Sequence, residues 1–75
     1  MSWQQYIERV PGVMLGKPVF RETRITVEFV LERLAQGARP EEQVRSHPPL
    51  TLEHVRAALE YALSMVRQDE LLSVL

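Results

Sequence analysis

Apolar residues between positions 52 and 66 recur at the spacing of one face of an α-helix. Five of them follow one another in alternating steps of three and four residues: Leu52, Val55, Leu59, Ala62 and Val66. A helix completes a turn about every 3.6 residues, so this spacing places all five on one side. No other pattern in the chain is as regular. It predicts an amphipathic helix that Thr51 caps and that ends near Arg67.

A shorter helix is predicted after residue 26. Four apolar residues at the i, i+3, i+4 and i+7 positions define its inner face: Val27, Val30, Leu31 and Leu34. The Thr26 hydroxyl can accept a hydrogen bond from a free N–H group of the first turn. Gly37 suits the position just past the helix end, where the backbone is commonly left-handed.

A further helix is predicted between these two. Pro40 fits its first position, and Glu41 and Glu42 follow in the first turn, where the helix dipole favours acids. Residues 47–49 (His-Pro-Pro) end it, because a residue before proline is pushed out of the helical region. Three helices with a sharp proline-containing turn before the last suggest a homeodomain-like helix-turn-helix unit.

The first 25 residues carry the turn signals of a short β-hairpin or arm. Residues 13–15 are an apolar run, and Gly16 and Lys17 can turn the chain back into residues 19–20. Residues 3–10 fit either a helical turn or a short strand. The predicted fold class is therefore mainly α, a homeodomain-like three-helix unit with a short N-terminal β-hairpin or arm. We expect one domain over residues 1–75, with the arm at 1–25, the three helices at 26–67 and a C-terminal tail at 68–75.

The chain has 75 residues, no cysteine and a formal net charge of −1. A chain of this length buries only about 60% of its unfolded surface, and no disulfide can stabilise it. We therefore expect a homodimer, with Phe20, Ile25 and Phe29 near the hairpin as interface candidates. No apolar run approaches the ~18 residues of a membrane span, and the start lacks the regions of a signal peptide. These features predict a cytoplasmic location and no membrane partner.

Two groups of residues resemble a known family. They are residues 16–20 (Gly-Lys-Pro-Val-Phe) with residues 23–25 (Thr-Arg-Ile), and Leu50-Thr51 with Glu53 and residues 55–59 (Val-Arg-Ala-Ala-Leu). Over roughly residues 7–63 the chain resembles domain-of-unknown-function family 433 (DUF433), small bacterial proteins that look like VapB-type antitoxins. The resemblance implies a homeodomain-like three-helix fold with an N-terminal β element. It also implies a role beside a PIN-like ribonuclease toxin, whose gene is often a neighbour.

The chain departs from the family pattern at four positions. Glu22 stands where the family usually has glycine. A glycine there would suit a positive φ, which glutamate adopts only at a steric cost, so the turn can differ here. Arg39 replaces a usual serine-like cap, His47 a usual aromatic residue and His54 a usual acid.

Three cations on the arm are candidates for nucleic-acid binding. Lys17, Arg21 and Arg24 can contact phosphates or an acidic partner surface. The alternative is a solvated hairpin in which Arg24 forms structural hydrogen bonds to helix C-termini.

The last helix is the one that a helix-turn-helix protein places in the major groove. Thr51 or His54 can then contact phosphate, and Arg56 can read guanine. Glu53 and Glu60 oppose binding to a polyanion, and a helix used for protein contacts explains them as well.

The tail after residue 67 is amphipathic. Asp69 and Glu70 precede Leu71 and Leu72. The apolar side chains can complete the domain's own core or dock into a groove of a toxin, and in the second case Asp69 and Glu70 can face a cationic active site.

The sequence contains no recognisable catalytic or metal-binding constellation. A proline turn separates His47 from His54, and no carboxylate completes a ligand set. No phosphate-binding loop or nucleophile–base pair is present. We therefore expect no enzyme activity, no metal and no cofactor.

Together these features favour a non-enzymatic antitoxin-like protein. It would form a homodimer, neutralise a co-encoded PIN-like ribonuclease and be able to bind its own operator DNA. Two alternatives stay open, a DNA-binding transcriptional regulator without a toxin partner and a structural protein-interaction module. The near-neutral charge and the acids on the last helix favour protein binding over DNA binding.

Overall fold

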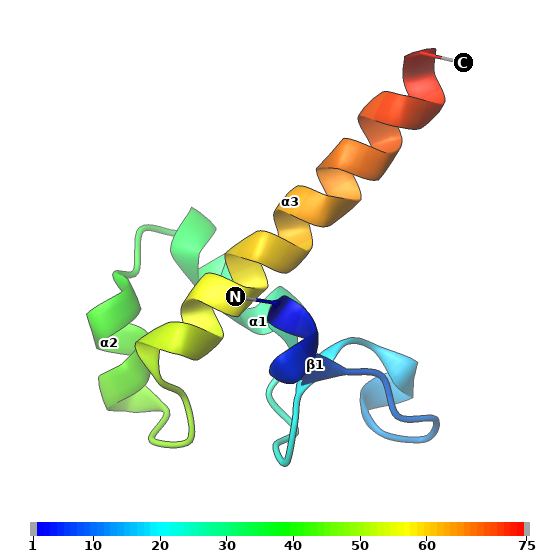
Figure 1. The fold of residues 1–75 in the computed structure, drawn as a ribbon. Coiled ribbons are helices and arrows are strands. Elements are labelled where there is room, and N and C mark those ends of the chain that lie inside the picture. Colours follow the sequence, from blue (N-terminus) through cyan, green and yellow to red (C-terminus); the bar gives the residue numbers. More distant parts are fainter. Residues whose placement is uncertain (1, 75) are drawn as a thin grey trace.

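A computed structural model describes the backbone of residues 2–74 and the side chains of residues 2–68. In chain order its elements are the 3-10 turn η1 (Trp3–Gln5), β1 (Ile7–Glu8), the 3-10 turn η2 (Met14–Gly16), β2 (Val19–Phe20), α1 (Val27–Ala35), α2 (Pro40–Ser46) and α3 (Leu52–Val74). The described part is mainly helical, with three helices and one two-stranded sheet. The rest of the fold gathers around the first half of α3, and the second half projects away from it (Figure 1).

The strands of the small sheet are not the pair that the sequence suggested. β1 pairs antiparallel with β2, with Ile7 opposite Phe20 and Glu8 opposite Val19. The expected strand at residues 13–15 is wrong, because Met14 and Leu15 adopt left-handed backbone conformations that no strand contains. The chain instead makes two turns between the strands, and η2 occupies the position of the expected strand.

The ends of α1 and α2 lie where the sequence predicts them. The Thr26 hydroxyl accepts a hydrogen bond from the Phe29 N–H group at 3.0 Å, and Gly37 follows α1 with a φ of +98°. Pro40 is the first residue of α2, which ends at Ser46, directly before the His-Pro-Pro stretch. These boundaries depend on interactions within a few residues, so the sequence alone is sufficient to predict them.

α3 is longer than expected and buries a different face. It runs to Val74, so the predicted end near Arg67 is wrong. Of the five apolar residues that define the periodic pattern, Val55 is buried, but Leu52, Leu59 and Val66 are each 51% exposed. The helix buries Val55 together with two alanines that the pattern did not include, Ala57 and Ala58.

Phe20 lies at the centre of the core. Its side chain is 0% exposed and packs in one cluster with residues from β1, α1 and α3 and from the turn before α3. Phe20 therefore offers no surface to a partner, and its assignment as an interface residue is wrong. Ile25 and Phe29 are half-buried at the edge of the same core. Across the described residues, no helix is both long and apolar enough to cross a bilayer.

Candidate protein-binding surface

The loop between the two strands exposes a large apolar side chain. Three successive residues, Met14, Leu15 and Gly16, have φ values of 47°, 59° and 76°. For a residue with a β-carbon this left-handed conformation costs roughly 1–2 kcal/mol. Leu15 in this loop is 94% exposed, and Met14 is 44% exposed. The sequence showed that residues 13–15 are apolar, but it did not show that the side chains of Met14 and Leu15 face the solvent.

Backbone and side-chain interactions hold this loop in place. The Gly16 N–H donates to the Val13 carbonyl at 2.9 Å, and the Lys17 N–H donates to the Met14 carbonyl at 3.1 Å. The Lys17 ammonium forms a 2.9 Å ion pair with Glu28 at the start of α1. The hydrogen bond and charge of Lys17 lower the pKa of the Glu28 carboxyl below its usual value. The loop is thus anchored to the helix beside it.

An open groove of about 280 Å³ lies next to the loop. The Phe29 ring forms one wall and packs edge-on against the His47 ring, with 5.0 Å between the ring centroids. The loop and this groove together form what we call the loop surface, defined by Met14, Leu15, Arg24, Ile25 and Phe29. It is mostly apolar, with one cation.

The three cations of the predicted nucleic-acid site do not form one cluster of free charges. Lys17 is paired with Glu28, and Arg21 is paired with Glu8 at 2.8 Å. Arg21 also donates to the Gln4 carbonyl at 3.1 Å. Arg24 is exposed and has no side-chain hydrogen bond or ion pair within residues 2–68, so the predicted bonds to helix C-termini are not observed there.

Thr51 and His54 bond to each other at the start of α3. The Thr51 N–H donates to His54 Nδ1 at 3.0 Å, and the His54 N–H donates weakly to the Thr51 hydroxyl at 3.4 Å. This reciprocal pattern is a capping box in which histidine replaces the usual glutamate or glutamine. The His54 ring also packs edge-on against Tyr6 and Phe20, each at 5.3 Å between centroids. Arg56, the third candidate on this helix, is exposed.

We predict that His54 makes the stability of the fold depend on pH. Burial lowers its pKa from the ordinary value of 6.5, because the charged ring loses hydration. The unfolded chain therefore binds the proton more readily. We expect this contribution to stability to be complete above about pH 6.5 and to be lost as the pH falls through the lowered pKa.

Thermal denaturation between pH 7.5 and 5.5 (values that bracket the ordinary histidine pKa of about 6.5) measures this effect. His54→Gln is the matched control, because glutamine can cap the helix and does not titrate. The difference in Tm between the two pH values should be smaller in the variant. An equal difference in both proteins would show that His54 is not responsible.

Glu22 adopts a positive φ, so the turn does not differ in the way that the replacement of the family glycine suggested. Its φ is 65°, in the turn between β2 and α1. The turn has kept the backbone geometry that suits glycine, although the side chain is glutamate.

Glu22→Gly is therefore expected to stabilise the fold. Relief of left-handed strain gains about 1–2 kcal/mol, and the greater freedom of glycine in the unfolded chain cancels about 0.5–1 kcal/mol of it. The net gain of about 1 kcal/mol should raise Tm by roughly 4–8 °C in a domain of this size. Glu22→Ala is the control, because it removes the charge but retains the strain. An increase in Tm in the alanine variant alone would contradict this account.

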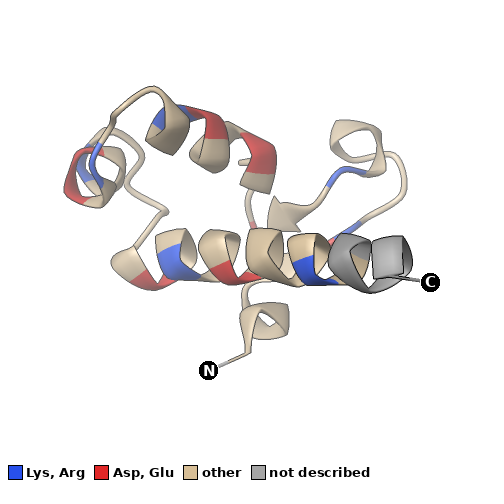
Figure 2. Ribbon diagram, turned by 90° about the horizontal axis from the view of Figure 1, so that it is seen from above, with Lys and Arg blue, Asp and Glu red and all other residues tan. Residues whose placement is uncertain are grey.

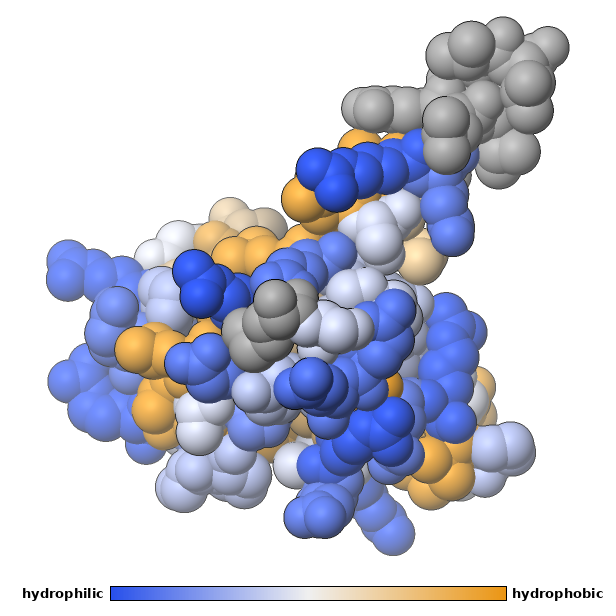
Figure 3. Space-filling view, viewed as in Figure 1, coloured by the Kyte–Doolittle hydropathy of each residue, from blue (hydrophilic) through white to orange (hydrophobic). Residues whose placement is uncertain are grey.

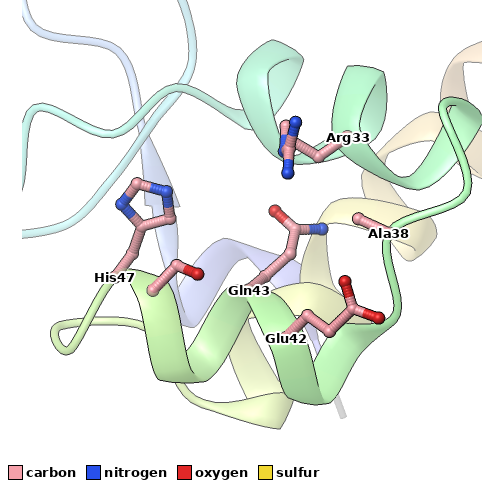
Figure 4. Close-up of a pocket in the computed structure, with 6 residues that line it drawn as sticks. Arg33, Ala38, Glu42, Gln43 and His47 are labelled. Atoms are coloured by element: carbon pink, nitrogen blue, oxygen red, sulfur yellow. The ribbon is translucent and has the colours of Figure 1, made fainter.

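A buried amide joins α2 to α1, and sequence reasoning missed it. Gln43 is 2% exposed, and its Nε2 group donates to the Val30 carbonyl at 3.2 Å. Its Oε1 atom has no hydrogen-bond partner among the described residues. The side chain lines a cavity of about 40 Å³ with Arg33, Ala38, Glu42, Ser46 and His47 (Figure 4). A cavity of this size can hold about one water molecule and is too small for a larger ligand. We therefore interpret the amide as a structural link between the two helices.

The remaining candidates are the four residues of the tail. The side chains of Asp69, Glu70, Leu71 and Leu72 lie outside the described residues, so the docking role of the tail stays a prediction. In the part of the chain with described side chains, no three His, Cys, Asp or Glu residues lie close enough to hold a metal ion.

Comparisons with known proteins find one family and one solved structure. The model of a family described as "Protein of unknown function (DUF433)" matches residues 7–62. The crystal structure of a DUF433 member protein from Anabaena variabilis ATCC 29413 is 35% identical in sequence and superposes with a TM-score of 0.79. The match covers 87% of this chain and 64% of the chain of the solved structure. No curated protein matches the chain.

Proposed function

The chain belongs to the DUF433 family, and we propose that it is a non-enzymatic, antitoxin-like protein that acts by binding another protein. The observation that carries this proposal is Leu15, which is 94% exposed on a strained and anchored loop. A bulky apolar residue is seldom found in the left-handed region without a reason. Backbone strain of this kind concentrates at functional sites, where it orients a side chain for contact.

The composition of the loop surface favours a protein ligand. Met14, Leu15, Ile25 and Phe29 supply apolar area, and Arg24 supplies one charge at its edge. Apolar residues with a polar rim are typical of protein interfaces. The exposed guanidinium suits an acidic group on the partner, with which it can form paired hydrogen bonds.

The partner that we propose is a co-encoded PIN-like ribonuclease toxin. The resemblance to VapB-type antitoxins supports this choice, and the loop surface supplies a region that could cover part of such an enzyme. On this account the chain suppresses the ribonuclease by occupying its surface.

Operator binding through a homeodomain-like arrangement of the helices is the second candidate function. Two observations weigh against it. Lys17 and Arg21 already have acidic partners, and α3 carries Glu53 and Glu60 next to Arg56. A regulator without a toxin partner would need a stronger positive surface, because phosphate contacts dominate DNA affinity.

Co-expression tests the proposal. The tagged protein is produced together with the product of its neighbouring gene, purified, and sized. We expect a stable complex of defined stoichiometry that survives moderate salt. Recovery of the tagged protein alone, together with tight operator binding that weakens steeply with salt, would overturn the proposal and favour the regulator.

A further inference from the structure

α3 carries a second apolar surface, separate from the loop surface. Leu52, Leu59, Leu63 and Val66 are each between 47% and 51% exposed. At about 100° per residue they fall within an arc of roughly 60° and extend over about 21 Å of the helix. Figure 3 shows apolar surface along this helix where it leaves the rest of the fold. We call these four residues the α3 stripe.

The charges on α3 lie on one flank of the α3 stripe. In chain order they are Glu53, Arg56, Glu60 and Arg67, so their sign alternates along the described side chains of the helix (Figure 2). The opposite flank holds Val55, which is buried, and Ala62, which is half-buried. The charged side chains therefore form a single row next to the apolar one.

This pattern is complementary to itself in one orientation. When two copies of a helix pack antiparallel about a twofold axis, each flank faces the same flank of the other copy. With Leu59 on the axis, Leu52 lies opposite Val66 of the second copy. Measured along the helix axis, Arg56 then lies about 3 Å from the level of Glu60 of the second copy. Glu53 likewise lies about 3 Å from the level of Arg67 of the second copy. Symmetry repeats both attractions, which gives four, against one repulsion between the two copies of Glu60, whose levels also differ by about 3 Å.

A parallel arrangement lacks this complementarity. A twofold axis parallel to the helices brings the charged flank of one copy against the flank with Val55 and Ala62 in the other. No opposite charges would then meet. The alternation of sign thus distinguishes the two orientations.

We infer that the α3 stripe is covered by a second copy of this chain, packed antiparallel through α3 with Leu59 at the twofold axis. This interface differs from the one near the hairpin that the sequence suggested. It leaves the loop surface free, because Leu15 and Phe29 do not belong to it. The inference does not rest on the proposed function, since a dimer can form with or without a toxin partner.

Charge reversal tests the inference. Sedimentation equilibrium of the full chain should give twice the monomer mass. Arg56→Glu should weaken the dimer by about tenfold, because it turns two symmetry-related attractions into repulsions. Arg56→Glu combined with Glu60→Arg should restore the dimer, because the pairs are re-formed with opposite sign. Circular dichroism of each variant checks that α3 still folds.

Disulfide trapping tests the orientation, and the absence of cysteine from the chain makes it specific. Under mild oxidation Leu52→Cys mixed with Val66→Cys should cross-link, while Leu52→Cys alone should not. A monomer at every concentration would overturn the inference. So would a failure of the double reversal to restore the dimer, or efficient self-cross-linking of Leu52→Cys.

Discussion

Leu15→Asn should weaken binding of the partner protein by about 10- to 100-fold. Full burial of a leucine side chain is worth about 1.5–3 kcal/mol, and each tenfold change in affinity corresponds to about 1.4 kcal/mol. Asparagine tolerates the left-handed backbone better than leucine does. The variant should therefore be as stable as the original protein, or slightly more stable. Isothermal titration and thermal denaturation of the same samples measure both quantities.

Met65→Gln is the matched control for this prediction. Met65 is 37% exposed on α3 and belongs to neither the loop surface nor the α3 stripe. The control removes exposed apolar area while keeping a residue that favours helix. Equal loss of affinity in both variants would show that the effect is not specific to the loop surface.

Phe20→Ala should destabilise the fold by about 3–5 kcal/mol, the usual cost of removing a buried aromatic side chain and leaving a cavity. Phe20 is 0% exposed and lies where β2, α1 and α3 meet, so no single neighbour can fill the space. Small domains have little stability to lose, and we expect the variant to be largely unfolded at 37 °C. Urea denaturation followed by circular dichroism provides the measurement.

Phe29→Ala is the comparison for the core substitution. Phe29 is half-buried and lines the groove of the loop surface. Its loss should reduce stability less than loss of Phe20, and it should also weaken partner binding. If the two variants lost equal stability, the core would not be centred on Phe20 as described.

The ends of α1 and α2 could be predicted because they depend on local chemistry. The hydroxyl of Thr26, the ring of Pro40 and the missing side chain of Gly37 each act on backbone groups only a few residues away. At Glu22 the resemblance correctly marked a position that suits glycine, but the expectation that glutamate would change the turn is wrong, because the positive φ is retained. These features do not require knowledge of distant contacts.

The strand pairing and the orientation of α3 could not be predicted in the same way. Met14 and Leu15 prefer extended or helical conformations, and only the surrounding structure holds them at positive φ. On α3 the most regular apolar pattern belongs largely to the exposed side, while Ala57 and Ala58 pack inside. Periodicity identifies a helix, but it does not say which of two apolar faces meets the core.

In the candidate site, too, the features that depend on tertiary packing could not be predicted from the sequence. The cap at Thr51 was predicted, and the structure confirms it. The role of His54 in that cap was not predicted, because it depends on the rotamer of the histidine. Gln43 carries no local signal, because its burial follows from the packing of α2 on α1. Leu15 lay in a recognised apolar run, but the run was interpreted as a strand.

Inhibition of the neighbouring ribonuclease is the measurement that tests the proposed function most directly. The purified enzyme is titrated with this protein while cleavage of a labelled RNA is followed. We predict that activity falls linearly to a low plateau at a fixed molar ratio, and that Leu15→Asn requires a large excess to reach it. Undiminished cleavage at a saturating excess of correctly folded protein would contradict the antitoxin account.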